Sequence, residues 1–218
     1  MKILKIRQNI FFVKKIDLIA DFFRRGKVIV YPTDTIYGLG CLATNKKAIN
    51  KIYKIKKREK KKPLLILVDS LAMAKRYCYV SKEQEKYLLR VWCLTPHPPF
   101  RRGAFRAVTV ILKSRGVLPK ELTGGADSLA VRLPKNDFLI KIIKAVKCPI
   151  VSTSVNIRGE KPLINVKNLG MYFRTPRTPL IRGAIKLPNL VVDAGKLKNK
   201  PSRIIDITDI ENVKLLRK

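Results

Sequence analysis

The chain has 218 residues, of which 46% are hydrophobic, so it can bury a core and does not have the composition of a disordered protein. Its 48 Lys and Arg residues against 15 Asp and Glu residues give a formal net charge of +33. Such a charge favours polyanionic partners, although it can also reflect a proteome that is rich in lysine.

The sequence excludes or argues against several classes of protein. A single histidine, His97, excludes a cluster of histidine metal ligands and argues against a Ser-His-Asp triad. The four cysteines are scattered without a CxxC pair, which excludes a zinc ribbon and argues against a disulfide framework. No apolar run approaches the ~20 residues of a membrane span, and charges interrupt the N-terminal segment where a signal peptide would be apolar. We therefore expect a cytoplasmic protein with no membrane partner.

Apolar periodicity predicts strands and helices that intermix along the chain. The predicted elements are a strand within 1–13, a helix at 14–25, a strand at 28–31, a helix at 46–57, a strand at 64–68, helices at 70–77 and 82–92, strands at 108–113 and 129–133, a helix at 136–147, and strands at 150–152, 191–193 and 203–207. This order indicates an α/β fold, one domain around a mixed sheet.

Two segments do not fit this pattern. Residues 93–107 and 173–184 are rich in Pro and Arg, lack Lys, and match each other at six of ten positions when aligned at an offset of 80. We interpret them as two insertions of one repetitive element in surface loops, the alternative being a chance likeness of two proline-rich loops.

Four segments carry side chains that suit polar or anionic ligands. Residues 31–40, YPTDTIYGLG, follow a strand with hydroxyls and glycines, which is also the composition of a turn. Residues 54–64, KIKKREKKKPL, are basic at seven of the first nine positions and lie between a helix and a strand, although such a run is usually a solvated face. Residues 149–156, PIVSTSVN, and 201–206, PSRIID, place hydroxyls at the ends of strands.

Five strings, in this order and spacing, resemble the YrdC-like family, the threonylcarbamoyl-AMP synthases: PTDTIYGLG, KKREKKKPL, SLAVRLP, VSTSVN and PSRIID. The resemblance covers nearly all of residues 10–217 and implies an α/β twist fold around a twisted mixed sheet, with a concave basic face. It implies a nucleotidyltransferase that converts ATP, with Mg²⁺, L-threonine and bicarbonate into threonylcarbamoyl-AMP and pyrophosphate. The product would pass to tRNA-modification transferase proteins for threonylcarbamoyladenosine at tRNA position 37.

The resemblance also implies roles for individual residues, carried over position by position. Lys56 and Arg58 match a Lys-x-Arg pair that grips the ATP phosphates, and they are the expected catalytic groups. The other expected ATP contacts are Lys62, Ser128, Ser154, Asn156 and Arg217. The expected threonine contacts are Thr35, Arg132, Ser152 and Ser202, with Arg132 on the carboxylate. No protein side chain is expected to bind a metal.

The sequence departs from the family pattern in several places. Glu59 replaces a proline, Val155 replaces an alanine, and Arg158 stands where serine is frequent, which puts the local nucleotide contact in question. Trp92 is kept, but the first insert displaces the Pro-Gly-Pro turn that should follow it. We do not expect the C-terminal domain of the larger family members, because the sequence stops at Lys218.

Two other interpretations stay open at this point. One is a non-catalytic RNA-binding module on the same fold, acting in ribosome or tRNA maturation. It would need the basic residues of the site, but not the joint presence of Thr35, Ser152 and Ser154. The other is a gene disabled by the inserts. The survival of all the motifs argues against this interpretation. We therefore expect a single-domain enzyme at residues 8–218, with direct RNA binding through the basic face left open.

Overall fold

The fold is described by a computed structural model that covers residues 2–6, 12–92, 107–157, 159–167, 169, 187–197 and 200–217. The helices are α1 (Phe12–Arg24), α2 (Lys46–Lys56), α3 (Leu71–Tyr77), α4 (Lys82–Val91), α5 (Lys120–Thr123) and α6 (Asp137–Val146). The strands are β1 (Lys2–Lys5), β2 (Ile29–Tyr31), β3 (Gly38–Gly40), β4 (Leu65–Leu67), β5 (Val108–Lys113), β6 (Ser128–Arg132), β7 (Ile150–Ser154), β8 (Leu190–Asp193), β9 (Arg203–Asp206) and β10 (Lys214–Arg217).

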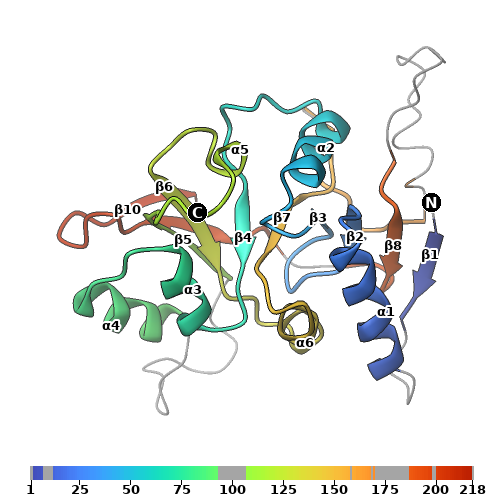
Figure 1. The fold of residues 1–218 in the computed structure, drawn as a ribbon, viewed down its shortest axis with the longest axis horizontal. Helices are drawn as coiled ribbons and strands as arrows, with labels where there is room; N and C mark the ends of the chain where they lie inside the picture. Colours follow the sequence, from blue (N-terminus) through green and yellow to red (C-terminus); the bar gives the residue numbers. More distant parts are fainter. Residues whose placement is uncertain are drawn as a thin grey trace.

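Across the described ranges these strands form one sheet in the order β1-β8-β2-β3-β7-β4-β6-β5-β9-β10 (Figure 1). The pairs β2–β8, β4–β6 and β5–β9 are parallel, whereas β3–β7, β4–β7 and β5–β6 are antiparallel. Helix α1 packs along α6, and α2 packs against α5 and β3. The predicted α/β fold around a mixed sheet is confirmed.

Most helices begin at residues that satisfy their free backbone N–H groups. The side chains of Asn45, Ser70 and Asn136 each accept a hydrogen bond from the backbone of the first helical turn. Ser81 and Gln84 form a reciprocal capping box at the start of α4. Within the ranges that the structure describes, no helix combines the length and apolarity of a membrane span.

The pleat of the central strands separates a core face from a ligand-accessible face. One row across the sheet is fully buried and apolar: Val110, Val131, Ile66 and Val151, joined by the registers of β5, β6, β4 and β7. The neighbouring row lies on the opposite face, because successive residues of a strand alternate. That row consists of Ile111, Ala130, Leu65 and Ser152, and it forms the floor of a pocket.

Tyr31 links three strands through the space left by two glycines. Its hydroxyl, at the end of β2, donates to the carbonyl oxygen of Val151 on β7 at 3.0 Å, although β3 lies between these strands. The ring passes over β3, where a Cβ on Gly38 would lie 3.0 Å from the ring and one on Gly40 would lie 2.7 Å from the phenol oxygen. The carbonyl oxygen of Val151 lies closer still to a Cβ on Gly40. The glycines of the GLG segment are therefore required by the close packing of the Tyr31 side chain and of the β7 backbone.

Most of the predicted elements are confirmed to within a few residues at their ends. Three elements are absent from the predicted list: β3 at 38–40, whose composition also suits a turn, α5 and β10. Within the strand expected at 1–13, the structure describes β1 at Lys2–Lys5, and α1 already begins at Phe12. The inserts at 93–107 and 173–184 lie outside the described residues, apart from Ala107. The carbonyl of Ala107 accepts the N–H of Arg203 at 2.8 Å, so this residue belongs to the sheet.

We expect Gly40→Ala to lower the free energy of unfolding by about 3 kcal/mol, because the new Cβ would overlap the carbonyl oxygen of Val151. Urea denaturation measures the loss. The matched control is Gly116→Ala, where φ is +72° but no atom lies within 4 Å of the new Cβ. Backbone strain alone should cost that variant about 1 kcal/mol. Equal losses in the two variants would contradict the close approach of β7 and the Tyr31 phenol to Gly40.

Candidate active site

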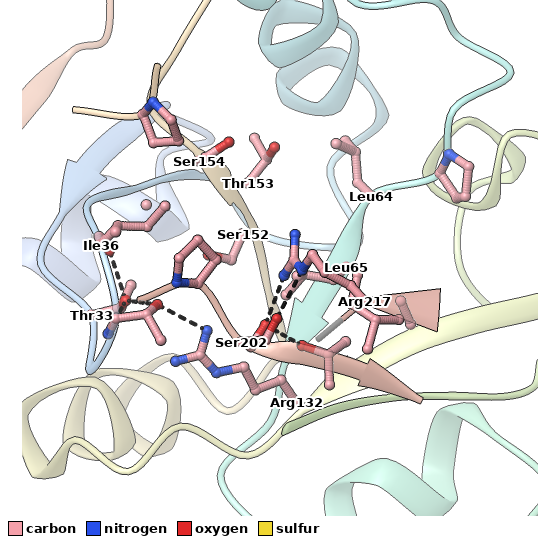
Figure 2. A pocket seen from close by; sticks show the side chains of 18 of the residues that line it. Thr33, Ile36, Leu64, Leu65, Arg132, Ser152, Thr153, Ser154, Ser202 and Arg217 are labelled. Carbon is pink, nitrogen blue, oxygen red and sulfur yellow. Dashed lines mark hydrogen bonds between the residues drawn. The ribbon is translucent and has the colours of Figure 1, made fainter. Parts of the chain in front are cut away.

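A pocket of about 420 Å³ opens on the accessible face of the sheet, with side chains converging on it from several strands (Figure 2). Eight of the predicted contacts line it: Thr35, Arg58, Lys62, Arg132, Ser152, Ser154, Ser202 and Arg217. A second pocket, of about 210 Å³, shares Arg58, Lys62 and Ser154 with the first and adds the predicted Lys56 and Asn156. The structure thus brings residues from position 35 to position 217 into one region.

Ser128 is the predicted contact that lines neither pocket. It begins β6 and stands two and four residues before Ala130 and Arg132, so it shares their face of the sheet. Its contact with ATP stays a prediction.

The first pocket is strongly cationic. Its lining contains Arg58, Lys62, Arg132 and Arg217, and no carboxylate among the described residues. Burial and the neighbouring charge of Arg132 both lower the pKa of Arg217, which shows that the two guanidinium groups repel each other. An anion placed between them would relieve that repulsion.

Arg132 lies at the end of β6 with only 5% of its side chain exposed. It forms an ion pair with Asp34, and its Nη1 donates to Thr35 Oγ1 at 3.2 Å, while its Nε has no hydrogen-bond partner among the described atoms. The second carboxylate oxygen of Asp34 accepts the backbone N–H of Lys135 at 3.1 Å. Burial lowers the pKa of Arg132, and the Asp34 carboxylate opposes that shift. Asp34 therefore holds a buried cation at the wall of the pocket.

The loop after β2 is fixed by the hydroxyl of Thr33. Thr33 Oγ1 donates to the carbonyl of Ile36 at 2.7 Å and accepts the N–H of Thr35 at 3.0 Å. It also lies 2.8 Å from Thr35 Oγ1, and Figure 2 shows this chain of contacts continuing to Arg132. The predicted threonine contacts Thr35 and Arg132 are thus joined directly.

Ser202 is the centre of a second polar group. Its hydroxyl lies 2.9 Å from Thr109 Oγ1, and it accepts from Arg217 Nη2 at 3.1 Å. Arg217 Nε also donates to the backbone carbonyl of Ser202 at 2.8 Å. Strand β10 is therefore tied through Arg217 to the segment that opens β9.

Lys56 lies at the end of α2 and is 4% exposed. Its ammonium donates to the backbone carbonyls of Ser154 and Asn156, the latter at 2.9 Å, and to Asn156 Oδ1 at 2.6 Å. Ser154 Oγ donates to the same amide oxygen at 2.6 Å. Burial and the neighbouring Arg58 guanidinium lower the pKa of Lys56 to about 7. This side chain fixes the loop after β7, so its geometry is that of a positioning residue.

Arg58 follows a reversal of the chain at Lys57, which ends α2 in the left-handed conformation with φ of 50°. Its guanidinium donates to the carbonyls of Lys62 and Pro63 at 3.2 and 2.9 Å, which closes the basic loop. Burial lowers the pKa of Arg58. The side chain lines both pockets, so it lies where a ligand would span them.

Sequence reasoning missed three residues that organise the site: Thr33, Asp34 and Thr109. The first two lie inside the PTDT string, whose hydroxyl at position 35 alone was given a role. Thr109 is fully buried on β5, and a threonine within the otherwise apolar run VTVIL is the signal that could have identified it.

The residues that line the two pockets indicate how the expected Mg²⁺ could be held. No cluster of three His, Cys, Asp or Glu side chains exists among the described residues. Glu59 lines the second pocket, but its carboxylate lies 3.6 Å from the ammonium of Lys62. This lining fits a metal ion that is held by the phosphates of a nucleotide, and does not fit one held by a protein cage.

The lowered pKa of Lys56 predicts a pH dependence of stability. The unfolded chain holds this proton up to about pH 10.5 and the folded chain only up to about pH 7, so the cost of burying the charge is lost as the pH rises between these values. Relative to Lys56→Met, the wild-type free energy of unfolding should increase by about 1–2 kcal/mol between pH 7 and pH 9. Chemical denaturation at each pH measures this difference. Replacing the exposed Lys54 of the same helix should produce no such trend. A difference between wild type and Lys56→Met that does not change with pH would contradict the assignment.

Comparison with known proteins agrees with this geometry. The model of the Sua5/YciO/YrdC family, described as "Telomere recombination", matches residues 21–218. A threonylcarbamoyl-AMP synthase of Pyrococcus abyssi is 30% identical over 200 residues, which cover 89% of this chain and 51% of that protein. A threonylcarbamoyl-AMP synthase of Photorhabdus laumondii subsp. laumondii is 32% identical over 183 residues, which cover 83% of this chain and 85% of the relative.

The solved structures lead to the same grouping. The crystal structure of Pyrococcus abyssi Sua5 complexed with L-threonine matches with a TM-score of 0.81 and 28% identity. The match covers 100% of this chain and 57% of that one, so this chain spans little more than half of the Pyrococcus protein. The resemblance carried by the five strings is confirmed, and the chain belongs to the Sua5/YciO/YrdC family.

Proposed function

We propose that this chain is a threonylcarbamoyl-AMP synthase, a nucleotidyltransferase that makes threonylcarbamoyl-AMP and pyrophosphate from ATP, L-threonine and bicarbonate. The observation that carries the proposal is a pocket lined by four cationic side chains, three serine hydroxyls and no described carboxylate. The triphosphate of ATP, bicarbonate and the carboxylate group of threonine repel one another, so a site that assembles them needs this excess of positive charge. The names of the relatives and the threonine complex of the Pyrococcus protein support the same reaction.

Threonine binds at the end of the pocket that contains Arg132 and Ser202. The repulsion between Arg132 and Arg217 favours a carboxylate at this end. Thr35, Ser152 and Ser202 supply the hydroxyls around the rest of the amino acid. The buried pair of Arg132 with Asp34 keeps the guanidinium in place before the substrate arrives.

ATP binds across the region shared by the two pockets. Arg58 and Lys62 line both, and their charges suit the triphosphate. Ser154, Asn156 and Arg217 surround the same space, with Lys56 holding the loop on which Ser154 and Asn156 stand. Mg²⁺ accompanies ATP and neutralises part of the phosphate charge.

The chemistry proceeds in two steps. The threonine amine attacks the carbon of bicarbonate and forms a carbamate, with release of water. A carbamate oxygen then attacks the α-phosphorus of ATP and displaces pyrophosphate. Positioning and electrostatic stabilisation account for catalysis of this kind, so the protein needs no histidine base. The product, a mixed anhydride, is passed to transferase proteins that modify tRNA.

The decisive experiment incubates the full chain with ATP, Mg²⁺, L-threonine and labelled bicarbonate. Release of pyrophosphate that depends on both threonine and bicarbonate, with label in a threonine adduct of AMP, supports the enzyme. Absence of release under all conditions, together with tight binding of tRNA, supports an RNA-binding module instead.

Arg58→Ala should lower kcat/KM for ATP by about 10- to 100-fold, because charge-assisted hydrogen bonds contribute roughly 1.5–3 kcal/mol. Arg58→Lys should recover only part of the activity, since an ammonium cannot form the planar fork. Initial rates against ATP concentration measure both, with circular dichroism to confirm folding. Undiminished activity of Arg58→Ala would remove Arg58 from the ATP site.

Replacing Arg132 should raise the threonine requirement by about one to two decades and leave the requirement for ATP unchanged. The substitution is best made as Arg132→Met together with Asp34→Asn, because Arg132→Met alone would leave a buried carboxylate without its cation. The single variant Asp34→Asn retains the guanidinium and serves as the control. A change confined to the ATP dependence would show that Arg132 does not bind threonine.

A further inference from the structure

The hydrogen bonds of Thr33 determine where the proton of Thr35 points. A carbonyl oxygen only accepts, so the 2.7 Å contact between Thr33 Oγ1 and the carbonyl of Ile36 uses the single proton of the Thr33 hydroxyl. In the 2.8 Å contact between the two hydroxyls, Thr35 must therefore be the donor. With the N–H of Thr35 as its second donor, Thr33 Oγ1 is saturated.

This arrangement leaves Thr35 with no proton to offer to the pocket. Its hydroxyl proton points to Thr33, and one of its two lone pairs accepts from Arg132 Nη1 at 3.2 Å. One lone pair remains, on a side chain that lines the pocket. Thr33 and Thr35 are 6% and 4% exposed, so bulk water cannot readily replace either partner and let the hydroxyl rotate.

We propose that Thr33 is a positioning residue that fixes the Thr35 hydroxyl as a hydrogen-bond acceptor toward the pocket, so that this point of the site selects an amine over a carbonyl group. The proposal rests on the proposed function, because it assigns the amine of the amino-acid substrate to Thr35. An amine or ammonium group donates to the free lone pair, whereas an oxygen that only accepts would face another acceptor.

The test compares two ligands that differ only in the group on the carbon next to the carboxylate. L-2-aminobutanoate presents an amine and 2-oxobutanoate a carbonyl, and both keep the carboxylate and the same carbon chain. Their dissociation constants are measured by calorimetric titration of the full chain, without ATP or turnover. The wild-type protein should prefer the amine, and Thr33→Val should reduce the ratio of the two constants by about tenfold, because the freed Thr35 hydroxyl can then donate.

Controls separate this effect from a general loss of structure. Thr33→Ser keeps the hydroxyl and should keep the wild-type ratio. Tyr53→Phe removes a phenol whose oxygen lies 2.9 Å from the carbonyl oxygens of Lys62 and Glu121, and it should also keep the ratio. If Thr33→Val does not fold, Thr33→Cys, whose thiol is a weak acceptor, should show the same direction of change. Equal weakening of both ligands in the Thr33 variants would overturn the proposal. Binding of neither L-2-aminobutanoate nor L-threonine to the wild-type protein would overturn the proposed function, and this inference with it.

Discussion

The buried charge of Arg132 is the constraint on which the rest of the site depends. A guanidinium that is almost fully removed from water is stable only if nearby acceptors replace the solvent, and Asp34 and Thr35 provide them. Both acceptors belong to the loop after β2, so the end of β6 and this loop must be placed together. The loop is held in turn by the hydroxyl of Thr33 and by the antiparallel pairing of β3 with β2 and with β7. The buried guanidinium of Arg132 thus connects β6 to the loop between β2 and β3, which belong to different halves of the sheet.

The cationic character of the pocket follows from how these charges are compensated. Asp34 neutralises Arg132 from behind and does not line the pocket, so its carboxylate does not compete with an incoming anion. Lys56 is surrounded by neutral carbonyl and amide oxygens, which hold the loop without cancelling the charge. Arg58 is bound in the same way by carbonyls of its own loop. Arg58 and Arg217 therefore keep a positive charge that no described carboxylate of the pocket lining neutralises, and this charge faces the ligand space.

The sequence predicted the fold class and most of the region of the site because the informative segments are short and local. Strand–turn strings such as PTDT and VSTS specify where hydroxyls gather, and apolar periodicity specifies the strands that carry them. Strand β3 was not predicted, because glycine has little strand propensity and the segment is fixed by the packing of Tyr31. The bonds of Lys56 were also beyond prediction, since its partners lie about 100 residues away in sequence. Local patterns indicate which residues are available, but only the tertiary registers decide which of them touch.

The order of the strands has a consequence for how this protein is made. Strands β2 and β5 pair with their neighbours in sequence, β3 and β6. Each of β2, β3 and β5 also pairs with a strand that is synthesised much later, namely β8, β7 and β9. Such non-local pairing slows folding, since the entropy cost of closing a long loop comes before the favourable contacts between the paired strands can form. During translation one edge of each of these strands lacks its later partner, and their apolar rows are exposed to other chains. The pocket cannot be complete until Arg217 has emerged and reached Ser202, so ligand binding requires the pairing of β9 with β10 as well as that of the earlier strands.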